Sequence, residues 1–196
     1  MARTRSIVST ARRRAAGLGI AAVCVGALVA GCSSSSSDSA ETDDANLLTA
    51  ATAWRVTAAE RDMLYRQGFN IAQDRVDAAL AAPHDKPLAI ITDIDDTVLS
   101  SDGYWTQLIA AGKQSFDDEL WDSWVAANGP TATPGAVEFA NYVASKGVQI
   151  FYISSRDQGE ETQAIGEANL AHVGLPFADG EHVTMLRDSS NKEPAQ

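Results

Sequence analysis

Cysteine and positive charge are both scarce in this chain. Of 196 residues only two are cysteines, Cys24 and Cys32, and both lie near the N-terminus, so the rest of the chain contains none. A disulfide within the main body of the chain is therefore excluded. Acidic residues outnumber Lys and Arg by 26 to 15, which gives a formal net charge of -11. Such an acidic surface argues against a nucleic-acid polymer as partner, because phosphate backbones require basic patches.

Two common phosphate-handling motifs are also missing. The chain contains no Gly-x-x-x-x-Gly-Lys loop, so it lacks the backbone cradle of P-loop nucleotide-binding proteins. None of its three histidines (His84, His172 and His182) stands in an Arg-His-Gly context. A phosphohistidine mechanism therefore receives little support.

The first 31 residues have the layout of an export signal. They contain no acid, and five arginines precede an apolar run from Leu18 to Ala30. That run is short for a membrane-spanning helix, and the order of charge followed by apolar residues is typical of a signal peptide. We expect residues 1–31 to be removed, which takes away five positive charges and changes the formal charge from -11 to -16.

Cys32 is the expected attachment site of a lipid. It ends the segment Leu28-Val29-Ala30-Gly31-Cys32, which resembles a bacterial lipobox. The alternative is an uncleaved N-terminal anchor. Residues 32–44 are rich in Ser and then acidic, so they predict a flexible tether. Residues 45–196 then form one domain, and we expect a lipid-anchored protein that faces outside the cytoplasm.

The most informative stretch is Pro87 to Leu99, where an apolar run ends in three acids and a threonine. The run predicts a buried parallel strand, and ligand sites of open α/β sheets lie beyond the carboxyl ends of such strands. The period of a strand places Asp93 and Asp95 on the same side. Two carboxylates this close favour a shared cation, with one of them available as a nucleophile. The alternative is an Asp-rich turn that only caps a helix.

The remaining pattern alternates helices with strands. Residues 45–82 show an apolar stripe at helical spacing, and residues 104–128 suggest a mostly helical insertion that contains several aromatic residues. Further helices are expected at 136–145 and 160–172, and further strands at 148–153 and 182–186. This order predicts an α/β fold with a parallel sheet and right-handed crossovers.

Together these motifs resemble the haloacid dehalogenase (HAD) superfamily. More narrowly, the chain is similar to the class C (subfamily IIIB) acid phosphatases, which include the lipoprotein e(P4)-like 5'-nucleotidases. The resemblance is carried by the following segments: Tyr65-Arg66-Gln67-Gly68-Phe69-Asn70, Asp93-Ile94-Asp95-Asp96-Thr97-Val98-Leu99, Trp121-Asp122-Ser123-Trp124-Val125, Pro134-Gly135-Ala136, and Phe151 through Arg156. It implies a Rossmann-like parallel sheet with helices on both faces and a helical, cap-like insertion.

The resemblance also implies an acid phosphatase that forms an aspartyl-phosphate. Asp93 would attack phosphorus, and Asp95 would protonate the leaving group and then deprotonate water. Mg²⁺ would be held by Asp93 and by the backbone of Asp95; it suits these hard oxygen ligands better than zinc does. The implied substrate-binding residues are Thr97, Ser154, Ser155, Arg156 and Lys192. Arg156 has an alternative role, because it could instead pair with a nearby acid.

A nucleoside monophosphate is the implied substrate class. Tyr104, Trp121 and Trp124 could form a wall on which a base stacks, and Trp121 is the preferred candidate by its register with the family. The alternative is that these residues belong to the core of the insertion, which is the commoner place for aromatic residues in a helical segment.

The chain departs from the family pattern in several places. Asp96 stands where the family has Glu, Ser100-Ser101 replaces Asp-Asn, and the family's Gly-Asp-Asn-x-x-Asp motif lies beyond Lys192. We therefore expect the last sheet strand or strands of the family fold, and one metal-binding acid, to be missing. The alternatives to an active phosphatase are a truncated, inactive or ligand-binding HAD-like lipoprotein and, less favoured, a phosphotransferase that uses the same site.

Overall fold

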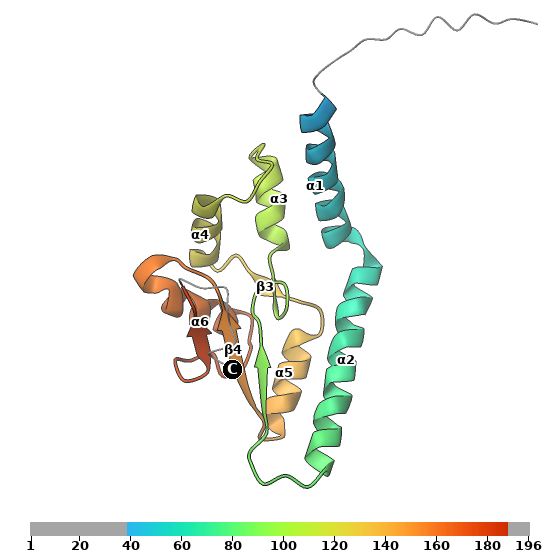
Figure 1. Cartoon of the computed structure of the whole chain (residues 1–196), viewed down its shortest axis with the longest axis vertical. Helices are drawn as coiled ribbons and strands as arrows, with labels where there is room; N and C mark the ends of the chain where they lie inside the picture. Colours follow the sequence, from blue (N-terminus) through green and yellow to red (C-terminus); the bar gives the residue numbers. More distant parts are fainter. Residues whose placement is uncertain (1–38, 188–196) are drawn as a thin grey trace, which may run out of the picture. The chain divides into compact units, whose positions relative to one another are not determined.

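The computed structural model describes the backbone of residues 39–187 and the side chains of residues 47–187 (Figure 1). The predicted signal segment 1–31 therefore lies outside the described residues. Within the described part, no helix is long and apolar enough to span a membrane.

A three-stranded parallel sheet forms the centre of the fold. It consists of β1 (Ala89–Thr92), β4 (Gln149–Ser154) and β5 (Val183–Met185), in the order β1-β4-β5. In the register of the first pair, Thr92 at the end of β1 lies beside Tyr152. The apolar runs at these positions predicted all three strands, and the α/β fold class is confirmed.

Two helices connect the strands of this sheet. α5 (Ala136–Ser145) lies between β1 and β4, and α6 (Thr162–His172) follows a short 3₁₀ turn, η1 (Gly159–Glu161), between β4 and β5. Just beyond α5, Gly147 has a φ of 77°, a left-handed conformation that glycine adopts without steric cost. Both helices begin and end within two residues of the predicted positions.

One face of the sheet carries the packed core. Alternate strand residues meet both connecting helices in a single apolar cluster; these residues are Ile90, Ile150, Tyr152 and Val183. On the opposite face Ile91 is 47% exposed and Thr184 is also exposed. Ile153, on the same face as Thr184, is nevertheless buried at 3%. Among the described residues both connecting helices pack on the first face, and the expectation of helices on both faces stays a prediction.

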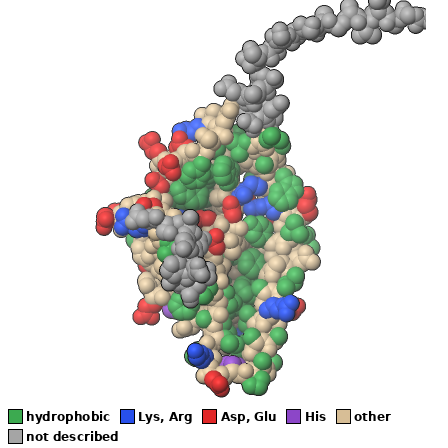
Figure 2. All heavy atoms as spheres, viewed as in Figure 1, with side chains coloured by type: hydrophobic (Ala, Val, Ile, Leu, Met, Phe, Trp, Pro, Cys, Tyr) green, Lys and Arg blue, Asp and Glu red, His purple; other side chains and the backbone are tan. Residues whose placement is uncertain are grey.

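Two consecutive helices precede the sheet. α1 (Ser39–Thr57) begins earlier than the predicted Ala45, inside the segment expected to be a tether, and α2 (Ala59–Ala81) follows almost directly. α2 packs beside α5 through its predicted apolar stripe; the stripe residues in the core cluster are Phe69, Val76 and Leu80. Figure 2 shows hydrophobic side chains gathered over α2, where Met63 and Leu64 are exposed.

The insertion is helical, as predicted. It contains α3 (Asp102–Ala110) and α4 (Asp118–Ala126), whose aromatic side chains form a second apolar cluster with Leu108 and Val125. A short antiparallel pair, β2 (Leu99–Ser100) with β3 (Thr131–Ala132), joins the two ends of the insertion. This pair was not predicted, because two residues are too few to show a period of two.

A substitution at Gly129 tests how tightly the insertion is packed. A Cβ atom on Gly129 would lie 2.2 Å from the indole Nε1 of Trp124, a rigid and buried ring. We expect Gly129→Ala to lower the free energy of unfolding by about 1 to 3 kcal/mol, since the ring must move. Thermal denaturation followed by circular dichroism measures the change.

Gly68 provides the matched control, because a Cβ there would meet nothing within 4 Å. It lies within α2, so Gly68→Ala should stabilise the protein by about 0.5 to 1 kcal/mol through helix propensity. Equal effects of the two substitutions would contradict the packing described here.

Candidate active site

The acidic residues after β1 form a compact turn. The carbonyl of Ile94 accepts the backbone N–H of Leu99 at 2.9 Å, and the N–H of Asp96 donates to the carbonyl of Leu99 at 2.6 Å. Asp96 has a φ of 54°, a left-handed conformation that Asp tolerates better than most residues. Asp93 is partly exposed, and its Oδ1 accepts the N–H of Ile94 at 2.8 Å.

The register of the sheet places the end of β4 beside this turn. Ser154 is the last residue of β4, and its hydroxyl lies 3.4 Å from Asp95 Oδ2. Arg156 approaches the same carboxylate with both arms, from Nε to Oδ2 at 2.8 Å and from Nη2 to Oδ1 at 2.6 Å. The structure thus brings Asp95, Ser154 and Arg156 together at the carboxyl ends of neighbouring strands, where ligand sites of such sheets lie.

Arg156 is held inside the protein. Its side chain is only 2% exposed, and its Nη1 donates to Asn169 Oδ1 at 2.7 Å. The guanidinium carbon lies 5.6 Å from the ring centre of Trp121. The implied role of Arg156 as a phosphate ligand is therefore not what the structure presents, because its donors are directed at protein groups. The alternative, a pair with a nearby acid, is the observed arrangement.

The other predicted polar residues have varied surroundings. Thr97 is partly buried, and its carbonyl accepts the Thr133 hydroxyl at 2.7 Å. Ser155 is exposed beside the buried Ser154. Lys192 and Cys32 lie outside the described residues, so their roles stay predictions.

Tyr104 does not form an exposed stacking wall. Its side chain is fully buried, and its hydroxyl accepts the N–H of Asp117 at 2.8 Å. The ring belongs to the core of the insertion and offers no exposed face in this structure, so its expected role in substrate binding stays a prediction that the burial does not support. Trp124 is 5% exposed and belongs to the same core. Trp121 keeps a partly exposed surface, and its ring centre lies 5.1 Å from that of Tyr104.

The third acid of the turn belongs to a separate charged network. Arg55 of α1 donates to Asp96 Oδ1 at 2.6 Å and to Asp102 Oδ1 at 2.9 Å. Arg61 donates to both oxygens of Asp102 at 2.9 and 3.1 Å. The Ser101 hydroxyl donates to Asp96 Oδ1 at 2.8 Å. Sequence reasoning missed this network, because each arginine lies more than 40 residues along the chain from its acidic partners.

Asp96 stays ionised because of these donors. Burial alone would raise its pKa, but the hydrogen bonds from Arg55 and Ser101 and the charge of Arg55 outweigh burial. The pKa of Asp96 is consequently held below its ordinary value of 3.8. The network therefore anchors α1 to the acid turn and engages Asp96, the third acid of that turn.

The oxygen atoms at and near Asp93 are of the type that binds a hard cation. The Asp93 carboxylate and the backbone carbonyl of Asp95 are the ligands that the family resemblance implied, and Mg²⁺ is commonly held by one or two carboxylates with water completing the shell. Among the described residues, no three His, Cys, Asp or Glu side chains gather as a metal cluster. The residues present therefore fit a partly hydrated Mg²⁺.

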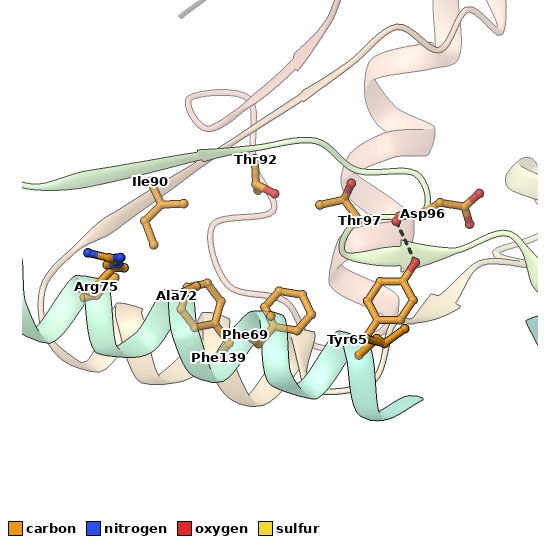
Figure 3. A pocket seen from close by; sticks show the side chains of 12 residues that line it. Tyr65, Phe69, Ala72, Arg75, Ile90, Thr92, Asp96, Thr97 and Phe139 are labelled. Atoms are coloured by element: carbon orange, nitrogen blue, oxygen red, sulfur yellow. Dashed lines mark hydrogen bonds between the residues drawn. The ribbon is translucent and has the colours of Figure 1, made fainter. Parts of the chain in front are cut away.

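An apolar groove of about 690 Å³ borders the acid turn (Figure 3). It lies between α2 and β1, and its apolar walls include Phe69, Ile90 and Phe139. At its polar end the Tyr65 hydroxyl donates to the backbone carbonyl of Asp96 at 2.9 Å. The Asp96 carboxylate points away from the groove, so the groove offers few polar groups for a phosphate.

Comparison with known proteins agrees with this geometry. A family model described as HAD superfamily, subfamily IIIB (acid phosphatase) matches residues 27–196. Among solved structures, the class C acid phosphatase from Bacillus anthracis superposes with a TM-score of 0.72 at 35% identity, covering 78% of this chain and 63% of that one. Its tungstate-bound form gives a TM-score of 0.71 at 35% identity, covering 77% and 62%.

Curated relatives match over a shorter stretch. The stem 28 kDa glycoprotein of Glycine max is 35% identical over 81 residues, which cover 41% of this chain and 31% of that protein. The stem 31 kDa glycoprotein of the same plant is 35% identical over 81 residues and is covered to 27%. The chain thus spans about a third of these glycoproteins and under two thirds of the solved phosphatase.

The anchoring network can be tested through Asp102. Asp102→Ala would leave the buried Arg61 without its carboxylate partner, because the Arg61 side chain is 7% exposed. We expect the free energy of unfolding to fall by about 3 kcal/mol, the cost of an uncompensated buried charge. Denaturant unfolding measures this change.

Glu138→Gln serves as the control, because the Arg66–Glu138 pair is exposed on both sides and separated by 3.9 Å. Its effect should stay below about 1 kcal/mol. A loss of similar size in both variants would show that Asp102 contributes only as an ordinary surface charge.

Proposed function

The chain belongs to subfamily IIIB of the HAD superfamily, the acid phosphatases, and from this premise we propose that it is a phosphomonoesterase that forms an aspartyl-phosphate on Asp93. The family match confirms the resemblance inferred from the sequence motifs. The activity of this chain, its metal, its substrate and its location are the subject of the proposal.

One observation carries the proposal. The acid pair Asp93 and Asp95 follows β1 directly, and Ser154 ends the neighbouring parallel strand within 3.4 Å of Asp95. A nucleophilic carboxylate, a second carboxylate for proton transfer and a hydroxyl at the same sheet edge are the groups that a two-step phosphate hydrolysis requires.

The proposed reaction balances in two steps. An oxygen of the Asp93 carboxylate forms a bond to phosphorus while the bond from phosphorus to the leaving oxygen breaks, and Asp95, in its protonated form, delivers its proton to that oxygen. Asp95 then takes a proton from water as the water attacks phosphorus, which releases phosphate and restores Asp93. Proton delivery to a poor alkoxide leaving group is worth roughly 10²- to 10⁴-fold in rate.

Mg²⁺ is the proposed cofactor. When bound at the Asp93 carboxylate and the Asp95 carbonyl, it would neutralise charge on the phosphoryl oxygens. Lys192 would add positive charge at the same place, as the family resemblance implies.

The proposed substrate class is a nucleoside monophosphate. Support comes from Trp121, which lies over Arg156 next to the acid turn and keeps part of its ring exposed. A flat indole face tolerates any base, which suits a broad specificity.

The proposed location is the outer side of the cell membrane, with the lipid on Cys32. The arginine-rich and apolar segment before this residue, together with the lipobox-like sequence that it ends, supports the proposal.

Hydrolysis of p-nitrophenyl phosphate tests the reaction. We expect turnover that depends on Mg²⁺, with EDTA abolishing it and added Mg²⁺ restoring it. Asp93→Asn should lower kcat by at least about 100-fold, since the nucleophile is lost. Asp85→Asn, in the exposed loop before β1, is the matched control and should keep the wild-type rate.

Two results would count against this scheme. Equal rates for wild type and Asp93→Asn would remove Asp93 from the mechanism. Absence of turnover in a folded wild-type protein that binds phosphate would favour the alternative of a ligand-binding lipoprotein.

The lipid anchor is tested separately in cells. Wild-type protein should incorporate labelled palmitate and sediment with membranes, whereas Cys32→Ala should lose both properties. Cys24→Ala is the control and should keep them, because Cys24 lies within the segment expected to be removed. Membrane attachment of Cys32→Ala without palmitate would favour an uncleaved N-terminal anchor.

A further inference from the structure

Arg156 holds the carboxylate that the proposed mechanism uses for proton transfer. Its two bonds to Asp95, of 2.8 and 2.6 Å, engage both carboxylate oxygens at once. A bidentate guanidinium pair fixes the plane of the carboxylate as well as its position. Asp95 therefore cannot rotate about its terminal bond without breaking at least one of these contacts.

Arg156 is itself immobilised by groups from three parts of the fold. Asn169 of α6 accepts a hydrogen bond from Nη1 at 2.7 Å, and the Arg156 backbone N–H donates to the Ser154 hydroxyl at 3.2 Å. Trp121 of α4 lies against the guanidinium. Asn169 is in turn held by the Val125 carbonyl, to which it donates at 2.8 Å. Through Arg156, the orientation of Asp95 is therefore fixed by contacts with the sheet, with α6 and with the insertion.

The hydrogen-bond arrangement distinguishes the two oxygens of Asp95. A carboxylate has about four acceptor positions, two on each oxygen. Among the described residues, Oδ2 receives Nε and, at 3.4 Å, the Ser154 hydroxyl, whereas Oδ1 receives Nη2. Of the two oxygens, Oδ1 is therefore the less crowded by these contacts.

We propose that Arg156 is a positioning residue, which aims Asp95 Oδ1 at the leaving oxygen and the attacking water instead of binding the phosphate. This inference rests on the proposed function, since it requires Asp95 to transfer the proton. It differs from the expected role of Arg156 as a substrate ligand, because the buried guanidinium acts through Asp95.

The dependence of kcat/KM on the leaving group tests this role. The ratio reports the steps up to release of the leaving group, so it is sensitive to proton delivery. Substrates would range from 2,4-dinitrophenyl phosphate, which needs no proton, to a simple alkyl phosphate, which does. The enzymes compared would be wild type, Arg156→Lys, Asp95→Asn and Arg187→Lys.

A positioning role has a distinct signature. Arg156→Lys keeps the charge but loses the bidentate contact, so its kcat/KM should fall by about 10- to 100-fold for the alkyl ester and by less than about 3-fold for the dinitrophenyl ester. Asp95→Asn should show the same pattern more strongly. The double variant should be no worse than Asp95→Asn alone, because Arg156 acts through that residue. Arg187→Lys changes an exposed arginine paired with the neighbouring Asp157 and should match wild type.

Other outcomes overturn the inference. A uniform loss for all esters, with weaker inhibition by inorganic phosphate, would make Arg156 a phosphate ligand. A uniform loss together with a lower melting temperature would make it structural only. If Asp95→Asn shows no leaving-group dependence, the proposed role of Asp95 in proton transfer is wrong. If Asp95→Asn shows the dependence and Arg156→Lys does not, only the positioning role of Arg156 is rejected.

A second variant guards against misfolding of Arg156→Lys. Asn169→Ser removes the Nη1 acceptor without altering Asp95 or Arg156 and should give the same leaving-group dependence at smaller size. The ion pair is also observable without turnover, because the Nε–H nitrogen resonance of Arg156 should shift in Asp95→Asn. An unchanged resonance would contradict the pairing.

Discussion

The ion pair between Asp95 and Arg156 is the contact on which the arrangement of the site depends. It joins the turn after β1 to the end of β4, and it forms because the parallel register brings these two chain segments side by side. A guanidinium that is 2% exposed needs a partner for its charge, and Asp95 provides it. Asn169 of α6 and Trp121 of α4 also contact the arginine, so both helices pack around the same side chain.

Much of the fold could be predicted from the sequence because its signals are local. The β-branched run before Asp93 indicated a buried strand, and the strand at Phe151 was recognisable in the same way. The stop at Gly147 depends on a property of one residue, its tolerance of a positive φ. The rule that ligand sites lie at the carboxyl ends of parallel strands located the acid turn, whereas Ser154 was expected beside it only through the family resemblance.

The remaining features depend on tertiary packing, which the sequence pattern does not specify. Tyr104 and Trp121 are both aromatic residues of a helical insertion, and only packing decides that the first is buried and the second half-exposed. Arg156 could turn toward a substrate or toward Asp95, and its direction is set by Asn169, which belongs to another helix. The two-residue pairing of β2 with β3 is likewise determined by the helices that it joins.

Because Arg156 is buried, dissolved salt should affect the approach of the substrate and the Arg156–Asp95 ion pair differently. Exposed charges interact across distances that are screened within about 10 Å at an ionic strength of 0.1 M, whereas buried pairs are screened far less. A chain with a formal charge of -11 repels an anionic phosphate ester as it approaches, and added salt weakens that repulsion. The contact between Arg156 and Asp95 is screened less than an exposed pair, because the Arg156 side chain is 2% exposed and that of Asp95 is 27% exposed. Changes in the ionic strength of the surroundings should therefore alter how quickly an ester arrives while leaving the aim of the carboxylate unchanged.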